Sequence, residues 1–212
     1  MAINKPEAWT SFDVVNRLRR LTGIRKVGHA GTLDPFATGV LLVCFAGATK
    51  EVDRLMELDK EYAAVIDLGK QTDTDDVTGK VIRERPYDDV TRDAVEEKLA
   101  SYRGEFYQTP PAFSAVKLKG QRLYKLARRG EAVEAPPRRV RIYELDIEAF
   151  SPPEVVLRIV CSRGTYIRAL ARDVGLELGC GAFVRRLCRT RVGPYRIEQA
   201  LQLADVERDF CR

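Results

Sequence analysis

The order in which helices and strands are predicted constrains the fold of this 212-residue chain more than any other feature. Apolar residues at the helical period predict helices, whereas short apolar runs predict strands. Helices are expected over residues 11–22, 50–58, 91–101, 122–129 and 165–178, and strands over residues 40–46, 60–68, 80–84, 138–150 and 155–161. Because the two kinds of element do not alternate regularly, this order favours an α+β fold with a mixed sheet over a doubly wound one.

Local signals mark the ends of the two strongest predicted helices. Ser11 is expected to cap the first helix and Gly23 to close it, because serine satisfies free N–H groups and glycine adopts the left-handed conformation. Thr165 and Gly179 are expected to do the same for the last helix. The first helix would carry a basic outer face formed by Arg17, Arg19 and Arg20.

Two segments are expected to be exposed. The acidic run Asp73–Asp76 precedes Thr78-Gly79 and is typical of a turn at the surface. Residues 104–121 contain Pro110-Pro111 and Gly120, which predict a long functional loop.

The length favours a single domain, since domains usually hold roughly 100–200 residues. We therefore expect residues 1–212 to form one domain without an interdomain linker. The longest mostly apolar stretch, Val40–Ala48, is too short to span a bilayer, and no signal-peptide pattern opens the chain. A cytoplasmic protein is expected.

Histidine and cysteine usage excludes several kinds of site. His29 is the single histidine, so sites with several histidine ligands are impossible and a Ser-His-Asp triad would have to include it. The five cysteines form no C-x-x-C pair and are odd in number, which favours reduced thiols over a disulfide framework. An enzyme of this composition is expected to use carboxylates and arginines, without a metal.

Positive charge is concentrated in one part of the sequence. The whole chain carries a net charge of +5, whereas residues 155–196 contain nine arginines, no lysine and two acidic residues, Asp173 and Glu177. The arginine guanidinium group matches phosphate oxygens bidentately, so this segment favours an RNA or DNA partner. A solvated basic face is the alternative that composition leaves open.

The segment Gly28–Gly39 is the strongest candidate for chemistry. Its three glycines permit unusual backbone conformations and close approach of another molecule. Pro35 restricts the backbone of Asp34, so the pattern predicts a carboxylate on a rigid loop close to His29.

Two other interpretations of this segment stay open. Asp34-Pro35 is also a common helix start, with aspartate as the cap and proline in the first turn. Gly28-His29-Ala30-Gly31 also matches the GXXG loop of KH domains, which clamps an RNA backbone without catalysis.

Six motifs, in order along the chain, resemble those of the bacterial tRNA pseudouridine-55 synthase (TruB) family. They are Lys5-Pro6 with Thr10-Ser11, Gly28–Gly39, Gly47-Ala48-Thr49-Lys50, Lys60-Glu61-Tyr62, Phe113-Ser114-Ala115-Val116-Lys117-Leu118-Lys119-Gly120, and Cys161-Ser162-Arg163-Gly164-Thr165-Tyr166-Ile167-Arg168. Together the matches span roughly residues 3–195. The resemblance implies the pseudouridine synthase fold, with a mixed, mostly antiparallel central sheet and flanking helices and loops.

The resemblance also implies roles for the matching residues. Asp34 would be the catalytic carboxylate, and Arg168 would pair with it, because a nearby cation favours the ionised form against the effect of burial. Tyr62 would stack on the flipped uracil and is a candidate to take the proton from carbon 5. The other positions would bind substrate: Tyr166 and Leu187 as walls of the base pocket, His29 in the space that the base vacates, and Lys117 and Lys119, with Arg122, as a grip on the RNA.

The implied reaction isomerises uridine 55 in the T arm of tRNA. The N-glycosidic bond breaks, the uracil turns over, and it is reattached through carbon 5. No cofactor is expected, and the protein is expected to act as a monomer. The family usually carries a further C-terminal RNA-binding domain of PUA type, which this sequence is expected to lack.

Three alternative functions remain. The first is a guide-RNA-dependent relative from archaea or eukaryotes, although Ala37-Thr38-Gly39 and the expected lack of a PUA domain favour the stand-alone bacterial type. The second is a non-catalytic RNA-binding module that uses the same basic face and does not need Asp34. The third is a metal-free glycosylase that releases the base.

Overall fold

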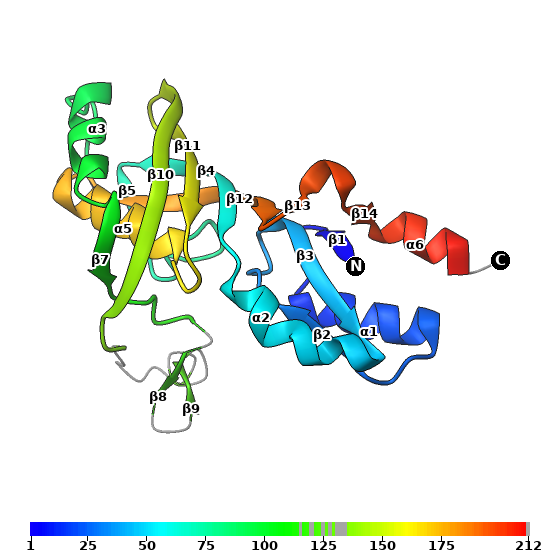
Figure 1. Cartoon of the computed structure of the whole chain (residues 1–212). Coiled ribbons are helices and arrows are strands. Elements are labelled where there is room, and N and C mark those ends of the chain that lie inside the picture. The colour runs from blue at the N-terminus through cyan, green and yellow to red at the C-terminus, as the bar shows by residue number, and fades with distance from the viewer. Residues whose placement is uncertain (115, 119–120, 124–125, 127–128, 130–134, 211–212) are drawn as a thin grey trace. The chain divides into compact units, whose positions relative to one another are not determined.

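The computed structural model describes residues 1–114, 116–118, 121–123, 126, 129 and 135–210, arranged as two compact units (Figure 1). Unit 1 comprises Met1–Ala63 and Leu187–Arg212, and unit 2 comprises Ala64–Arg186. Two strands, β4 (Lys60–Leu68) and β12 (Ala182–Val192), contribute residues to both units.

Unit 1 is built on a mixed sheet with the strand order β14-β1-β3-β12. Its own strands are β1 (Ala2–Lys5), β2 (Val27–Ala30), β3 (Thr38–Phe45), β13 (Tyr195–Arg196) and β14 (Leu201–Gln202). β1 and β2 both run antiparallel to β3, whereas β12 runs parallel to β3 and β14 runs parallel to β1. The helices are α1 (Ser11–Thr22), α2 (Val52–Glu57) and α6 (Leu203–Phe210), with short 3-10 turns at Ala46–Glu51 and Ile197–Gln199.

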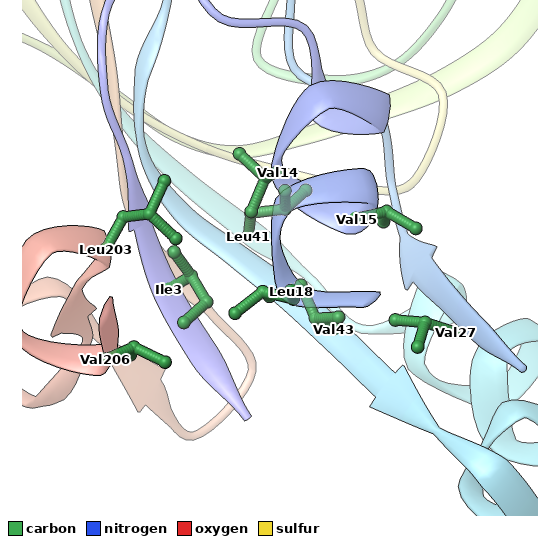
Figure 2. Close-up of a cluster of buried hydrophobic side chains, with 9 residues drawn as sticks. All are labelled: Ile3, Val14, Val15, Leu18, Val27, Leu41, Val43, Leu203 and Val206. Atoms are coloured by element: carbon green, nitrogen blue, oxygen red, sulfur yellow. The ribbon is translucent and has the colours of Figure 1, made fainter. Parts of the chain in front are cut away.

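The main core of unit 1 lies between its sheet and the helices α1 and α6. Figure 2 shows the nine buried side chains of this cluster: Ile3, Val14, Val15, Leu18, Val27, Leu41, Val43, Leu203 and Val206. Val14 and Leu18 are four residues apart and therefore share one face of α1. Leu41 and Val43 alternate along β3 and therefore point to the same side of the sheet. This core fixes α1 against β3, the strand that follows Asp34.

The predicted first helix is confirmed as α1, but its predicted cap is wrong. Thr10 is the N-cap: its hydroxyl accepts a hydrogen bond from the Asp13 N–H at 3.0 Å, and the Asp13 carboxylate accepts one from the Thr10 N–H at 2.9 Å. Gly23 closes the helix with φ of 69°, as expected. The reciprocal capping box at Thr10 leaves the Ser11 hydroxyl available for a contact with the loop that precedes Asp34.

Unit 2 contains the other end of the sheet order, β12-β4-β11-β10-β7. These further strands are β7 (Gly104–Gln108), β10 (Arg138–Ser151) and β11 (Glu154–Cys161), and both β7 and β11 run antiparallel to β10. β5 (Lys70–Thr72) pairs with β6 (Val81–Glu84), and β8 (Lys117–Leu118) pairs with β9 (Gln121–Arg122). The helices α3 (Arg92–Ala100) and α5 (Ile167–Glu177) contact each other, and α3 also contacts β10.

The predicted α+β class and mixed, mostly antiparallel sheet are confirmed. The structure contains the predicted strands that correspond to β3, β4, β6, β10 and β11 and the predicted helices that correspond to α1, α2, α3 and α5. The predicted loop over residues 104–121 is wrong in part, because β7 and β8 lie within it. The expected helix over residues 122–129 falls mostly outside the described residues. Strands β1, β2 and β12 were not predicted.

Among the residues that the structure describes, no helix is long and apolar enough to span a membrane. Cys44, Cys161, Cys180 and Cys188 are free thiols, as the cysteine pattern predicts.

Candidate active site

Asp34 lies on a tight turn that leads directly into β3. Its backbone carbonyl accepts a hydrogen bond from the Ala37 N–H at 3.1 Å, and the strand begins at Thr38. The helix-start interpretation of Asp34-Pro35 is therefore wrong, because a turn and a strand follow this pair. The side chain of Asp34 is half-buried.

The KH interpretation of the glycine pattern is also wrong. Val27–Ala30 form strand β2, in which Gly28 pairs with Cys44 and His29 with Val43 of β3. The segment is thus part of a sheet, whereas a GXXG motif of the KH type is a loop that clamps an RNA backbone.

Arg189 holds the backbone that precedes Asp34. Its side chain is buried, with 1% of its surface exposed. Its Nε donates to the Val40 carbonyl at 2.8 Å, and its Nη atoms donate to the carbonyls of Gly31 at 3.0 Å and Thr32 at 3.4 Å. One guanidinium group therefore ties the loop to the first residues of β3.

Position 39 requires glycine because strands β3 and β12 approach each other closely there. Gly39 pairs with Arg189 between the parallel strands β3 and β12, and its φ is 103°. A Cβ atom at this position would lie 2.3 Å from the Arg189 carbonyl oxygen, which no real structure tolerates. The close approach of the two strands places the Arg189 backbone directly beside the start of β3.

Two further buried side chains fix the residues on either side of Asp34. The Ser11 hydroxyl accepts from the Leu33 N–H at 2.9 Å and donates to the Leu33 carbonyl at 3.2 Å. The Lys5 ammonium donates to the carbonyls of Trp9 at 2.6 Å and Pro35 at 3.2 Å. Charge-assisted hydrogen bonds of this kind are shorter and stronger than neutral ones. Asp34 is thus presented on a turn that is held before and after it.

The charge of Lys5 also acts on Asp34. Burial lowers the pKa of Lys5 to about 8, and the negative charge of Asp34 opposes that change. Lys5 therefore stays mostly protonated near pH 7, and by reciprocity its positive charge favours the ionised form of Asp34.

We predict that Arg189→Leu destabilises the protein by at least about 3 kcal/mol, because each hydrogen bond to a charged group contributes about 1.5–3 kcal/mol and three backbone carbonyls would lose their donor. The free energy of unfolding in urea measures this change. Arg54→Leu is the matched control, since the Arg54 side chain is 78% exposed on α2. A loss of less than about 1 kcal/mol in Arg189→Leu would contradict the proposed anchoring role.

The other predicted site residues of unit 1 lie on its strands. His29 is on β2, Tyr62 on β4 and Leu187 on β12; Tyr62 and Leu187 are buried, with 9% and 7% of their surfaces exposed. Burial, and to a lesser extent the charge of Arg189, lowers the pKa of His29, so its imidazole is neutral near pH 7. Beside Tyr62, Glu61 accepts hydrogen bonds from Thr190 and Arg191, each at 3.2 Å, which join β4 to β12.

In unit 2, Arg168 is buried near the start of α5, where several groups hold it. Its Nη1 donates to the Thr74 carbonyl at 2.8 Å, and its Nη2 donates to the Phe113 carbonyl at 2.9 Å. Its Nη1 also lies 3.3 Å from the Asp76 carboxylate, and the two side chains are only 4% and 5% exposed. The planar guanidinium group reaches these partners at once, which fixes its orientation.

The expected exposure of the acidic turn is wrong in part: Asp73 is exposed, but Asp76 is not. Asp76 is buried, and its Oδ1 accepts from the Thr78 N–H at 2.9 Å, the Thr78 hydroxyl at 2.5 Å and the Thr74 hydroxyl at 2.8 Å. The turn folds inward because Arg168 and Arg172, four residues apart on α5, supply the charges that compensate its carboxylates. The composition of residues 73–76 is typical of an exposed turn. The arginines that compensate the carboxylates are distant along the chain, so the sequence does not show that folding brings them close.

Arg172 joins the same network through Asp75. Its Nη1 lies 3.3 Å from Asp75 Oδ2, its Nε donates to Asp173 at 2.8 Å, and its Nη2 donates to the Thr109 carbonyl at 3.1 Å. Burial raises the pKa of Asp75 from 3.8 to about 6, although Arg172 and Arg168 oppose the increase. The folded protein therefore binds a proton at Asp75 more tightly than the unfolded chain does.

This difference predicts a pH-dependent stability. Between about pH 4 and pH 6, Asp75 ionises in the unfolded chain before it ionises in the folded protein, so the free energy of unfolding falls as the pH rises. We expect Asp75→Asn to remove about 1–3 kcal/mol of this fall between pH 4 and pH 7. Urea unfolding across that range measures it, with Asp88→Asn at an exposed position of unit 2 as the control. Parallel pH profiles for wild type and Asp75→Asn would contradict the prediction.

The remaining predicted residues of unit 2 lie near the start of α5 or on β8. Tyr166 is the N-cap residue of α5, in place of the predicted Thr165, and packs against a cluster of Val116, Leu123 and Ala135. The buried Gln108 amide donates to the Tyr166 carbonyl at 3.0 Å and accepts from its N–H at 2.8 Å. The backbone of Lys117 lies in β8, and Lys119 falls outside the described residues.

The candidate site residues thus divide between the units. His29, Asp34, Tyr62 and Leu187 belong to unit 1, whereas Tyr166, Arg168 and Lys117 belong to unit 2: the pairing of Asp34 with Arg168 stays a prediction. Four residues that position them were not predicted from the sequence: Lys5, Arg189, Asp76 and Gln108. The motif Lys5-Pro6 draws attention to Lys5. The sequence does not show, however, whether a lysine or arginine is buried or exposed.

Comparisons with known proteins identify the family. Residues 19–167 match the family described as TruB family pseudouridylate synthase (N terminal domain). Residues 168–211 match the tRNA pseudouridylate synthase B C-terminal domain.

Curated relatives extend this similarity over almost the whole chain. The sequence is 50% identical over 205 residues to tRNA pseudouridine synthase B of Geotalea uraniireducens, which covers 97% of this chain and 66% of that protein. It is 47% identical over 216 residues to tRNA pseudouridine synthase B of Thermobifida fusca, which covers 98% of this chain and 74% of that protein. This chain therefore spans about two thirds to three quarters of the length of these relatives.

Solved structures share the fold. A chain in the crystal structure of a Cbf5-Nop10-Gar1 complex matches with a TM-score of 0.75 and 31% identity, over 97% of this chain and 52% of that chain. A chain in the crystal structure of the archaeal box H/ACA sRNP Nop10-Cbf5 complex matches with a TM-score of 0.73 and 28% identity, over 99% and 53%. Since the sequence matches and the fold agree over nearly all of its length, the chain belongs to the TruB family of pseudouridylate synthases.

Proposed function

We propose that this protein is a tRNA pseudouridine synthase that isomerises uridine 55 in the T arm of tRNA. The observation that carries the proposal is the presentation of Asp34. Its half-buried carboxylate stands on a turn whose neighbouring residues are held by buried Ser11 and Lys5. A rigidly positioned carboxylate is what a reaction at a flipped nucleotide requires, because misplacement by about 1 Å can cost 10²-fold in rate.

The reaction is a rearrangement in which no atom is lost. The bond between the ribose C1′ and uracil N1 breaks, a bond between C1′ and C5 forms, the hydrogen on C5 leaves, and N1 gains a proton. The detached uracil must stay in the site between these steps. A second carboxylate that activates water, as in glycosidases, would divert the reaction to hydrolysis.

In this proposal the predicted residues take the roles that the family resemblance implies. Asp34 acts on the target nucleotide, and Arg168 pairs with Asp34 and keeps it ionised. Tyr62 stacks on the flipped uracil, while Tyr166 and Leu187 form walls of its pocket. The neutral imidazole of His29 occupies the space that the base leaves, since a buried charge there would be unfavourable.

RNA binding would depend on the arginine-rich segments and on Lys117 and Lys119. Base flipping costs a few kcal/mol, which contacts with phosphates must offset. We propose further that the whole chain acts as a single catalytic domain, as a monomer in the cytoplasm and without a cofactor.

One alternative in the same family is a guide-RNA-dependent enzyme, since two of the matching chains belong to H/ACA RNA–protein complexes. The higher identity to tRNA pseudouridine synthase B favours the stand-alone reaction. A non-catalytic RNA-binding module would not need the Asp34 turn, nor the buried side chains of Ser11, Lys5 and Arg189 that hold it.

The test is incubation of the purified protein with unmodified tRNA, in the absence of guide RNA, followed by mapping of pseudouridine. We expect a single pseudouridine at position 55 and no free uracil. A tRNA with cytidine at position 55 is the matched control and should stay unmodified. Conversion only with guide RNA, release of uracil, or binding without conversion would each overturn the proposal in favour of one named alternative.

A further inference from the structure

The edge strand β7 lies beside β10, as Figure 1 shows. Tyrosine and arginine side chains of these two strands form an exposed patch. In the register of these strands, Arg139 stands opposite Tyr107, and Arg141 stands opposite Glu105. Opposite residues in an antiparallel pair share one face. Val140 and Ile142 alternate with the two arginines and are buried on the other face.

The side chains of this patch are accessible to solvent. Tyr107 is 74% exposed, which exceeds the exposure of every other large apolar or aromatic side chain among the described residues. Tyr143 is 43% exposed, and the side chain of Arg139 is 67% exposed. A contiguous exposed patch that contains aromatic rings is typical of an interaction site.

The arginines are arranged for binding to bases and phosphates. The guanidinium carbon of Arg141 lies 5.3 Å from the centre of the Tyr143 ring, so the two groups stack. Arg139 forms an ion pair with Glu105, and Arg163 is exposed just beyond the end of β11. The surface therefore alternates flat rings with guanidinium groups and carries more positive than negative charge.

Acidic residues farther along β10 do not counter this charge. Glu144 and Asp146 both pair with Arg158, with distances of 2.6 Å and 3.3 Å. The excess positive charge is thus confined to the part of β10 that pairs with β7.

We propose that this Tyr107–Tyr143 patch binds unpaired RNA, with bases stacked on the tyrosine rings and phosphates contacted by Arg139 and Arg141. Base stacking on aromatic side chains tolerates any sequence, whereas the arginines supply electrostatic attraction. The inference rests on the proposed function only in that RNA is the partner; the patch is composed of residues that have no role in the proposed chemistry.

A protein strand added to the edge of β7 is the other occupant that such an edge could accept. The backbone of an added strand would not require arginines or stacked rings on the face of the sheet. The charge and the side chains therefore favour RNA.

The experiment uses a fluorescently labelled ten-nucleotide oligoadenosine, which contains no uridine and cannot be a substrate. We expect wild type to bind it in a salt-dependent manner and Tyr107→Ala to bind it about 5- to 100-fold more weakly, the equivalent of one lost stacked base. Tyr107→Phe should bind like wild type, because the ring is kept. Arg141→Gln should lower the slope of log affinity against log salt by about one.

Ile82→Ala is the control, because Ile82 is 65% exposed on β6 of the same unit and outside the patch. Equal binding of the oligoadenosine by wild type and Tyr107→Ala, or no binding by wild type, would overturn the proposal that the patch binds RNA. Photo-crosslinking from position 107 to a protein partner in place of the RNA would overturn it as well. Conversion of tRNA by wild type is scored separately, so the failure of this inference and the failure of the proposed function are distinguishable.

Discussion

Asp34→Asn is expected to lower the rate of pseudouridine formation by at least about 10³-fold while leaving the fold intact. Asparagine has nearly the same shape but cannot carry the negative charge that the proposed reaction needs, and a positioned acid or base alone contributes about 10²–10⁴-fold. The turn itself should persist, because it depends on the Asp34 backbone carbonyl and on side chains that remain unchanged. Single-turnover conversion of unmodified tRNA measures the effect.

The control for this variant is Asp53→Asn, the same substitution at an exposed position of α2. It should convert tRNA at the wild-type rate. Thermal unfolding of Asp34→Asn should show a stable protein, and its tRNA affinity should remain within a few-fold of wild type. Conversion by Asp34→Asn at more than a tenth of the wild-type rate would remove Asp34 from the chemistry.

Arg168→Lys is expected to lower the same rate by about 10²–10³-fold, the range for loss of a positioned charged donor. A lysine ammonium has one nitrogen, so it cannot reach the carbonyls of Thr74 and Phe113 and the Asp76 carboxylate in the geometry that the guanidinium group uses. The defect should appear in the rate at saturating tRNA more than in tRNA affinity. That division separates a role beside Asp34 from a role in phosphate binding.

Arg158→Lys is the matched control, because Arg158 is a partly exposed arginine that pairs with Glu144 and Asp146 on the sheet of unit 2. It should retain the wild-type rate. Near-normal turnover by Arg168→Lys would refute the proposed pairing with Asp34, whereas a loss confined to tRNA affinity would assign Arg168 to the RNA backbone.

Elements with strong local signals were predictable from the sequence. The apolar stripes of α1 and α5 reflect burial of one face of a helix, whereas the apolar run of β3 reflects a strand that is buried on both faces. The missed strands lack such a signal. β2 is a four-residue strand, Val27–Ala30, with a glycine in it, and β12 is interrupted by four arginines.

The candidate site was predictable in part and for a different reason. Gly28–Gly39 contains an unusual combination of glycines, aspartate and proline, so Asp34 could be selected before its surroundings were known. The sequence alone does not exclude a helix that starts at Asp34-Pro35, because the Asp-Pro pair is favoured both in turns and at helix starts.

The sequence by itself determined the family, the α+β class and the identity of the candidate carboxylate, because these depend on local motifs and their order. Only the tertiary structure decided which charged residues are buried. Arg189 and Lys5 lie far from Asp34 along the chain or on another strand, yet they hold its loop. Asp75 and Asp76 face inward because two arginines on α5 reach them across about ninety residues of sequence. Burial of a charge depends on a partner brought close by folding, and no local pattern records that partner.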